Sequence, residues 1–165
     1  MKSGPLEDDA ETDPILPYSI AKDAVRRWLA SVSKRREVSW KWLRIFYSYG
    51  EGQAKTSLIE QFQQAVLSGA RTFPMSGGEQ LRDYQPVSDL AQQIALASLQ
   101  TDIQGPINCC SGSPTSVRRL VEQFRGQLST EIELELGRYP YPDYEPMAYW
   151  GLRRKLDSIF ASRRT

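Results

Sequence analysis

The sequence predicts an α/β fold whose strands pair mainly in parallel. Stretches with apolar residues at helical spacing alternate along the chain with short segments rich in β-branched and aromatic residues. Glycine turns follow several of these short segments, and one of them, TEIELELG, alternates strictly between apolar and polar residues. With 165 residues, 40% of them hydrophobic, the chain can bury the core of one such domain.

The first third of the chain is expected to contain a loop, a long helix and a strand. Residues 1–17 are acidic and interrupted by proline, which predicts a loop or a frayed end. A helix is predicted from Tyr18 to about Ser33, because apolar residues recur there at helical spacing, namely Ala21, Val25, Trp28, Leu29 and Val32. After a basic turn, KRRE, the stretch VSWKWLRIFYSYGEG is typical of a strand that ends at a glycine pair.

The middle third is expected to continue this alternation. The stretch SLIEQFQQAVLSG predicts a helix that stops at Gly69 and buries one face, formed by Leu58, Phe62, Ala65 and Val66. A short strand at 72–75, a tight turn at 77–78 and the extended segment LRDYQPV come next. Ser88 or Asp89 is expected to cap the helix that follows, DLAQQIALASLQ.

The last third begins with GPINCCSGSP, which predicts a short buried strand that closes in a glycine turn. Ser113 or Thr115 is expected to begin the helix SVRRLVEQFRG. In the strand TEIELELG, the apolar side is formed by Ile132, Leu134 and Leu136. The stretch RYPYPDYEP is expected to be rigid and irregular, and YWGLRRKLDSIF predicts a final helix.

The charge balance excludes several classes of partner. Lys and Arg number 21 against 20 Asp and Glu, so the net charge of +1 offers no attraction to nucleic acid or anionic membrane. The basic and aromatic stretch KRREVSWKW is better explained as a core strand flanked by solvated charges than as a nucleic-acid patch. The sequence has no apolar run of membrane-spanning length and its first residues lack the apolar core of a signal peptide, which predicts a cytoplasmic protein.

Two features of the composition narrow the chemistry. The chain has no histidine, which removes Ser-His-Asp and Cys-His catalysis and most zinc sites. Its two cysteines, Cys109 and Cys110, are neighbours without CxxC spacing, so they are expected to be buried apolar residues of a strand. No metal site is predicted.

The stretch PYSIAK places Tyr18 and Lys22 four residues apart at the start of a helix. This spacing puts both side chains on one face. The pair is either a catalytic phenol with an assisting ammonium or a partly buried tyrosine beside a surface lysine. Spacing alone favours the second interpretation, because a chain with eight tyrosines contains such pairs by chance.

Four motifs in a fixed order change that balance. They are YSIAK at a helix start, LRIFYSYGEG, GGEQLRDYQPVSDLAQQIALA and GPINCCSGSPTSVRRLVE, and together they extend over nearly the whole chain. This order resembles the extended short-chain dehydrogenase/reductases, the NAD-dependent epimerase/dehydratase family that acts on nucleotide sugars. The stretch YPYPDYEPMAYW resembles the bacterial branch of nucleotide-sugar epimerases and reductases.

The resemblance implies a catalytic role for Tyr18 and Lys22. Tyr18 would act as the general acid or base for a sugar hydroxyl while hydride moves between the sugar and NAD or NADP. A phenol is a poor base at neutral pH, but a nearby ammonium and the positive end of a helix favour the phenolate. In the family the lysine also hydrogen-bonds the nicotinamide ribose, so Lys22 is assigned to cofactor binding as well.

Three further residues receive roles from the resemblance. Arg82 would bind the diphosphate of a dTDP-, UDP- or GDP-linked sugar, for which a guanidinium fork is suited; the alternative is a surface pair with Asp83. Arg138 resembles the late nucleotide-binding arginine of the family, and a surface residue is its alternative. Tyr47 stands where the family usually has asparagine and is assigned to a polar contact with the cofactor or sugar.

The resemblance also predicts the domain organisation. Residues 1–50 would be a remnant of the Rossmann domain with the YxxxK helix and the following strand. Residues 51–165 would be mainly the small α/β substrate-binding domain, with 86–125 returning a helix, a strand and a helix to the doubly wound Rossmann sheet. The glycine-rich dinucleotide fingerprint and the family's catalytic Ser or Thr would precede YSIAK, and neither is found in this sequence.

The chain is therefore expected to act as the C-terminal half of such an enzyme and to be inactive by itself. Its partner would be the missing Rossmann half or a second copy of the chain. The leading hypothesis is an NAD(P)-dependent nucleotide-sugar oxidoreductase or epimerase that works at C4 of the sugar. The alternative is a non-catalytic module that binds a sugar nucleotide or another protein.

Overall fold

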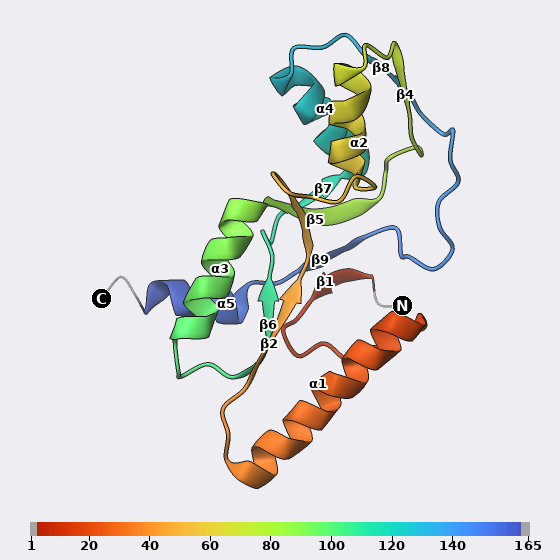
Figure 1. Cartoon of the computed structure of the whole chain (residues 1–165). Coiled ribbons are helices and arrows are strands. Elements are labelled where there is room, and N and C mark those ends of the chain that lie inside the picture. Colours follow the sequence, from red (N-terminus) through yellow and green to blue (C-terminus); the bar gives the residue numbers. More distant parts are fainter. Residues whose placement is uncertain (1–2, 163–165) are drawn as a thin grey trace.

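The structure is a computed structural model that describes residues 3–162. Its elements form two groups, one above the other, with a band of short strands between them (Figure 1). The expectation of an α/β fold with mainly parallel pairing is confirmed, since β1–β9, β2–β6, β3–β5 and β4–β8 pair in parallel and β5–β7 antiparallel.

The lower group is built on a parallel pair of strands. Strand β2 (Lys41–Ile45) pairs with β6 (Gly105–Cys109), which sets Leu43 opposite Ile107. Helices α3 (Val87–Leu99) and α5 (Arg154–Ala161) pack on this pair. The core that results consists of Ala97, Ile107 and Ile159, with Leu43, Leu96 and Ile103 packed against it.

The upper group contains α2 (Leu58–Leu67), α4 (Val117–Gln127) and the parallel pair β4 (Thr72–Pro74) and β8 (Glu133–Glu135). Its buried residues are Ile59, Phe62, Phe73, Met75, Leu120, Val121 and Ile132. The predicted apolar face of α2 lies in this core. The unit expected at 86–125 divides between the groups, because α3 and β6 pack with β2 whereas α4 packs with α2.

The band between the groups holds the remaining strands. Strands β3 (Tyr47–Tyr49), β5 (Leu81–Pro86) and β7 (Pro114–Ser116) form one sheet in the order β3-β5-β7. Strand β1 (Gly4–Leu6) pairs with β9 (Tyr149–Gly151), so segments from the two ends of the chain lie side by side. The buried carboxylate of Asp83 accepts hydrogen bonds from the backbone N–H groups of Ser111, Gly112 and Gly151. These bonds join β5 to the turn after β6 and to the end of β9.

Three local predictions are wrong, two of them because strand pairing overrides the local pattern. Residues 4–6, expected in a loop, form β1 because β9 offers them an edge. Residues 149–151, expected in the final helix, form β9, and the helix begins only at Arg154. Helix α1 (Pro17–Arg36) includes most of the expected basic turn, and Glu37 closes it with a φ of 52°.

Two predicted helix caps are also wrong. Helix α3 begins at Val87 with Pro86 as its N-cap, so Ser88 and Asp89 lie inside the first turn. The cap of α4 is Ser116, whose Oγ accepts the backbone N–H of Arg119 at 3.1 Å. A short strand, β7, occupies the residues just before it, which moves the helix start past Thr115.

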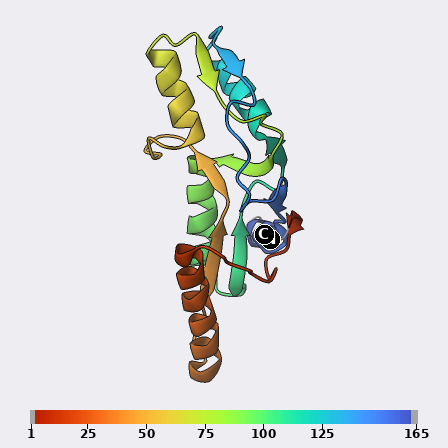
Figure 2. The same ribbon diagram turned by 90° about the vertical axis from the view of Figure 1, so that its right-hand side faces the viewer.

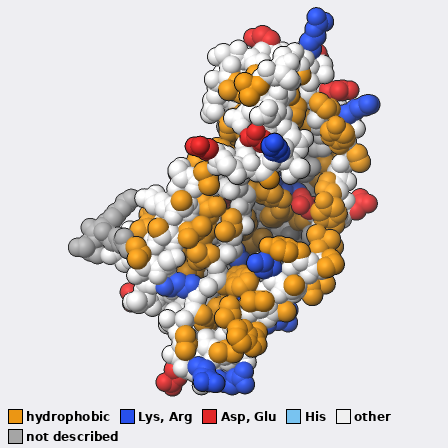
Figure 3. All heavy atoms as spheres, in the orientation of Figure 1, with side chains coloured by type: hydrophobic (Ala, Val, Ile, Leu, Met, Phe, Trp, Pro, Cys, Tyr) orange, Lys and Arg blue, Asp and Glu red, His pale blue; other side chains and the backbone are white. Residues whose placement is uncertain are grey.

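Helix α1 exposes apolar side chains to solvent and buries a charged one. Its lower half extends beyond the other elements (Figure 2) and carries an apolar surface (Figure 3). Val25 is 49% exposed and Trp28 is 61% exposed, while Asp23 is the buried residue of the helix. No helix among residues 3–162 is both long enough and apolar enough to cross a bilayer.

Candidate functional site

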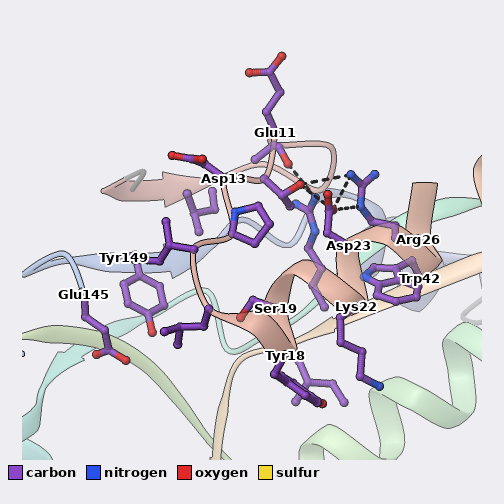
Figure 4. Close-up of a pocket in the computed structure, with 18 of the residues that line it drawn as sticks. Glu11, Asp13, Tyr18, Ser19, Lys22, Asp23, Arg26, Trp42, Glu145 and Tyr149 are labelled. Atoms are coloured by element: carbon purple, nitrogen blue, oxygen red, sulfur yellow. Dashed lines mark hydrogen bonds and ion pairs between the residues drawn. The ribbon is translucent and has the colours of Figure 1, made fainter. Parts of the chain in front are cut away.

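A cleft of about 800 Å³ lies between α1, β2 and two irregular segments. One of these is the N-terminal arm, residues 7–16, and the other is the C-terminal segment, residues 138–148. In Figure 4, Tyr18, Ser19 and Lys22 approach the cleft from α1, whereas Glu145 and Tyr149 approach it from the far side of the arm. The cleft therefore collects side chains from both ends of the chain.

Tyr18 and Lys22 lie together in this cleft, as the motif predicts. Pro17 begins α1, so Tyr18 is in the first turn, where backbone N–H groups are unpaired and the helix end is positive. The Nζ atom of Lys22 lies 5.5 Å from the centroid of the Tyr18 ring. Tyr18 is 73% exposed, so it adds little to the core and is accessible to a ligand.

Asp23 binds the N-terminal arm to α1. Its carboxylate accepts hydrogen bonds from Thr12 Oγ1 at 2.7 Å, Arg26 Nε at 2.8 Å and Arg27 Nε at 2.6 Å. Burial opposes the charged form, but these hydrogen bonds outweigh it and lower the pKa of Asp23 to about 2. In Figure 4 the side chains of Asp23 and Arg26 point toward the N-terminal arm, whereas those of Tyr18 and Lys22 point away from it.

Arg44 holds the same arm from the strand side of the cleft. From β2 its guanidinium donates to the backbone oxygens of Glu7 at 3.3 Å and Ala10 at 2.7 Å. Burial lowers the pKa of Arg44 from its ordinary value. The arm is thus bound at Thr12 to α1 and at Ala10 to β2, which closes one wall of the cleft.

Arg82 lies on β5 and is 3% exposed. Its Nη2 is 2.9 Å from Glu145 Oε2, and its Nη1 donates to the backbone oxygens of Leu81 and Met147. Its Cζ lies 4.4 Å from the centroid of the Tyr149 ring. Burial disfavours the charged guanidinium, but the hydrogen bond to Glu145 outweighs it and the pKa of Arg82 is raised.

The alternative of a surface pair between Arg82 and Asp83 is wrong. Both residues are buried, and the Asp83 carboxylate accepts backbone N–H groups. The partner of Arg82 comes from a segment 63 residues later in the chain. The role of Arg82 in binding a diphosphate stays a prediction. Such a ligand would compete with the Glu145 carboxylate for the Arg82 guanidinium.

Tyr47 lies with Arg82 rather than with Tyr18 and Lys22. The hydroxyl of Tyr149 donates to that of Tyr47 at 3.0 Å, and Tyr47 donates to Glu145 Oε1 at 3.3 Å. Burial raises the pKa of both phenols, so both are protonated donors at neutral pH. The Tyr47 ring also packs 5.2 Å from that of Tyr84, whose pKa burial raises to about 12.

Arg138 is not brought to the cleft. Its side chain is 66% exposed, with Nε 3.9 Å from Glu135, and its backbone N–H binds the carbonyl of Met75 in the upper group. Sequence reasoning missed Glu145, Tyr149 and Asp23. The first two lie within YPYPDYEPMAYW, whose resemblance to nucleotide-sugar enzymes was the one available signal.

The cysteines behave as expected from the sequence. Both are fully buried, and burial raises the pKa of Cys109 to about 11 and of Cys110 to about 12, so neither is a thiolate at neutral pH. Within residues 3–162 there is no group of three or more Cys, Asp or Glu side chains that could hold a metal ion.

Comparison with known proteins relates the chain to one family. The model of the NAD dependent epimerase/dehydratase family matches residues 1–110. The chain is 32% identical over 153 residues to dTDP-6-deoxy-L-talose 4-dehydrogenase (NAD(+)) from Aggregatibacter actinomycetemcomitans, covering 91% of this chain and 56% of that protein.

Solved structures agree on the fold. UDP-N-acetylglucosamine 4-epimerase from Methanobrevibacter ruminantium M1, in complex with UDP-N-acetylmuramic acid, matches with a TM-score of 0.83 and 25% identity over 93% of this chain and 50% of that one. UDP-glucose 4-epimerase from Thermotoga maritima, with UDP-glucose, matches with a TM-score of 0.82 and 23% identity over 96% and 51%. The chain thus spans about half the length of the proteins it matches.

Proposed function

The chain belongs to the NAD-dependent epimerase/dehydratase family, and we propose that it carries the acid–base group and the sugar-nucleotide side of an oxidoreductase or epimerase. The reaction would be oxidation or reduction at C4 of a dTDP-, UDP- or GDP-linked sugar. The observation that carries the proposal is the exposed pair Tyr18 and Lys22 in a cleft that Glu145, the partner of Arg82, also lines.

Tyr18 is the proposed catalytic residue. During oxidation its phenol group takes the proton of the C4 hydroxyl, and during reduction it returns that proton to the C4 oxygen. Its position in the first turn of α1 supports this role, because the unpaired N–H groups there favour negative charge. The exposure of the ring leaves the hydroxyl accessible to a sugar in the cleft.

The residues of the cleft fit one end of NAD or NADP. Lys22 Nζ makes no hydrogen bond or ion pair with residues 3–162, so its three donors are available to a ribose. Trp42 of β2 also lines the cleft and adds apolar surface to it. A bound NAD(P) would supply the hydride acceptor or donor.

We propose that another protein surface packs on the exposed apolar residues of α1. This surface is assigned either to the part of the fold that carries the dinucleotide fingerprint or to a second copy of the chain. The exposed Val25 and Trp28 support this assignment, because contiguous apolar surface of this kind is typical of an interface.

Calorimetric titration of the chain with dTDP-, UDP- and GDP-linked sugars tests the binding role directly. We expect at least one of them to bind. For catalysis, the chain is joined to the N-terminal half of the Aggregatibacter relative, and NADH is followed by absorbance in the presence of the sugar that binds. Lack of binding by all three classes of nucleotide sugar would contradict the proposal.

A further inference from the structure

The carboxylate of Glu145 stands against the one arginine that is fully buried at the edge of the cleft within residues 3–162. We propose that Glu145 holds the place at Arg82 that a phosphate of the ligand takes, and that ligand binding displaces the part of the C-terminal segment between Arg138 and Met147, while those two residues stay bound. The inference rests on the proposed nucleotide-sugar function and names a regulation of that same site.

The protein itself engages much of the Arg82 guanidinium. Its Nη1 is engaged by two backbone oxygens, of Leu81 and Met147, and one face of the guanidinium lies on the Tyr149 ring. The remaining Nη2 edge is the one that Glu145 occupies at 2.9 Å. The Arg82 side chain is only 3% exposed, so an anion that binds at the Nη2 edge has to replace the Glu145 carboxylate there.

Few hydrogen bonds hold the segment that carries Glu145 to the rest of the described residues. The C-terminal segment is held at its ends, where the Arg138 N–H binds Met75 O and the Leu81 N–H binds Met147 O. Between these points, two side chains of the segment hydrogen-bond other parts of residues 3–162. Tyr141 donates to Glu79, and Glu145 accepts from Arg82 and Tyr47. Figure 1 shows this stretch as a long irregular connection from β8 to β9.

Once Glu145 has left, an anion site remains in place. Arg82 stays oriented by the two backbone oxygens and by Tyr149, so its Nη2 donors keep their direction. The Tyr47 hydroxyl, which now donates to Glu145 Oε1, becomes free to donate to the same ligand. A guanidinium and a phenol with convergent donors suit a phosphate oxygen.

The physical consequence is a competition inside the chain. A ligand binds only the fraction of molecules in which Glu145 is displaced, so the observed dissociation constant is the intrinsic one divided by that fraction. Glu145 is 30% exposed and Arg82 is 3% exposed, so the pair is partly shielded from water, which strengthens the attraction between the two charges and lowers the open fraction. Removing the charge of Glu145 should then strengthen binding rather than weaken it.

The test is calorimetric titration of the full chain with UDP, comparing wild type with Glu145→Gln. We expect UDP to bind the variant about tenfold more tightly than wild type, since the amide competes far less for Arg82. The control is Glu122→Gln, which removes a carboxylate from the exposed pair with Arg118 and should leave UDP affinity unchanged. Equal or weaker binding of UDP by Glu145→Gln overturns the inference while leaving the nucleotide-sugar function standing.

A second measurement needs no variant. Amide hydrogen exchange at Glu145, whose N–H binds Pro142 O, should become faster when UDP is added to wild type, because the segment opens. Unchanged or slower exchange in the presence of bound UDP overturns the inference. Failure of wild type and of both variants to bind UDP or any nucleotide sugar overturns the proposed function together with the inference.

Discussion

Lys22 stands one helical turn after Tyr18 on α1, with its Nζ atom 5.5 Å from the centroid of the tyrosine ring. Neither side chain takes part in the core, and both line the cleft between α1 and β2. The two side chains therefore contribute little to the stability of the fold. Substitutions at these two positions should report on chemistry and binding rather than on folding.

Replacing Tyr18 by Phe removes the hydroxyl and keeps the ring. In the joined enzyme described above we expect kcat to fall by about 10²–10⁴-fold, the usual contribution of a general acid or base, while the affinity for NADH changes little. Stopped-flow absorbance and NADH titration measure the two quantities. A variant that retains more than about a tenth of wild-type kcat would show that Tyr18 is not the proton-transfer group.

Replacing Lys22 by Met keeps an unbranched side chain and removes the ammonium. We expect both kcat and NADH affinity to fall, because Lys22 has two proposed roles, as the charge beside Tyr18 and as a donor to the cofactor. Lys34→Met, in the last turn of the same helix, is the matched control and should change neither. Unaltered NADH affinity in Lys22→Met would remove Lys22 from the cofactor site.

Replacing Arg82 by Ala should weaken sugar-nucleotide binding by about 1.5–3 kcal/mol and NADH binding much less, because charge-assisted hydrogen bonds are the strong ones. The residue is buried, so the melting temperature is measured beside the dissociation constants. Arg125→Ala, near the C-terminal end of α4, is the control. Equal sugar-nucleotide affinity in a folded Arg82→Ala variant would contradict the diphosphate role.

Replacing Asp23 by Asn should destabilise the protein in a pH-dependent way. The folded-state pKa of about 2 lies below the ordinary 3.8, so the carboxylate stabilises the fold fully above about pH 4 and progressively less toward pH 2. At pH 7 we expect a loss on the order of 1–2 kcal/mol in the free energy of unfolding. Urea denaturation at pH 7, 4 and 2.5 measures it, with Asp13→Asn as the control.

The difference between wild type and Asp23→Asn should narrow as the pH falls from about 4 to about 2. In this range the unfolded state takes up a proton at its ordinary pKa of 3.8 while the folded state stays charged until about pH 2, so the advantage of the charged carboxylate is lost. A difference that is constant across this range would mean that the carboxylate charge is not what binds the arm to α1.

The apolar face of α1 predicts association of the isolated chain. We expect the mass measured by light scattering to rise with concentration, because Val25 and Trp28 expose apolar surface that self-association would cover. Trp28→Glu should reduce the association, whereas Leu67→Glu, on the exposed side of α2, should not. A monomer that persists at all concentrations would contradict the prediction.

Elements with a local, repeated signal could be predicted from the sequence. The spacing of Leu58, Phe62, Ala65 and Val66 predicted α2, and these residues do pack in or against the upper core. Cys109 and Cys110 were predicted to be buried in a strand region and are fully buried. The YxxxK spacing predicted that Tyr18 and Lys22 share one helix face, because a helix brings residues four apart together whatever surrounds it.

Contacts between groups far apart in the sequence could not be predicted in this way. Arg82 and Glu145 are 63 residues apart and Tyr47 and Tyr149 are 102 apart, so no periodic pattern along the chain relates them. The pairing of β1 with β9 and the capture of the arm by Asp23 depend likewise on where the strands and helices are placed. Such contacts join groups that only the three-dimensional arrangement brings together, and their free energy depends on burial and direction, which a linear spacing does not encode.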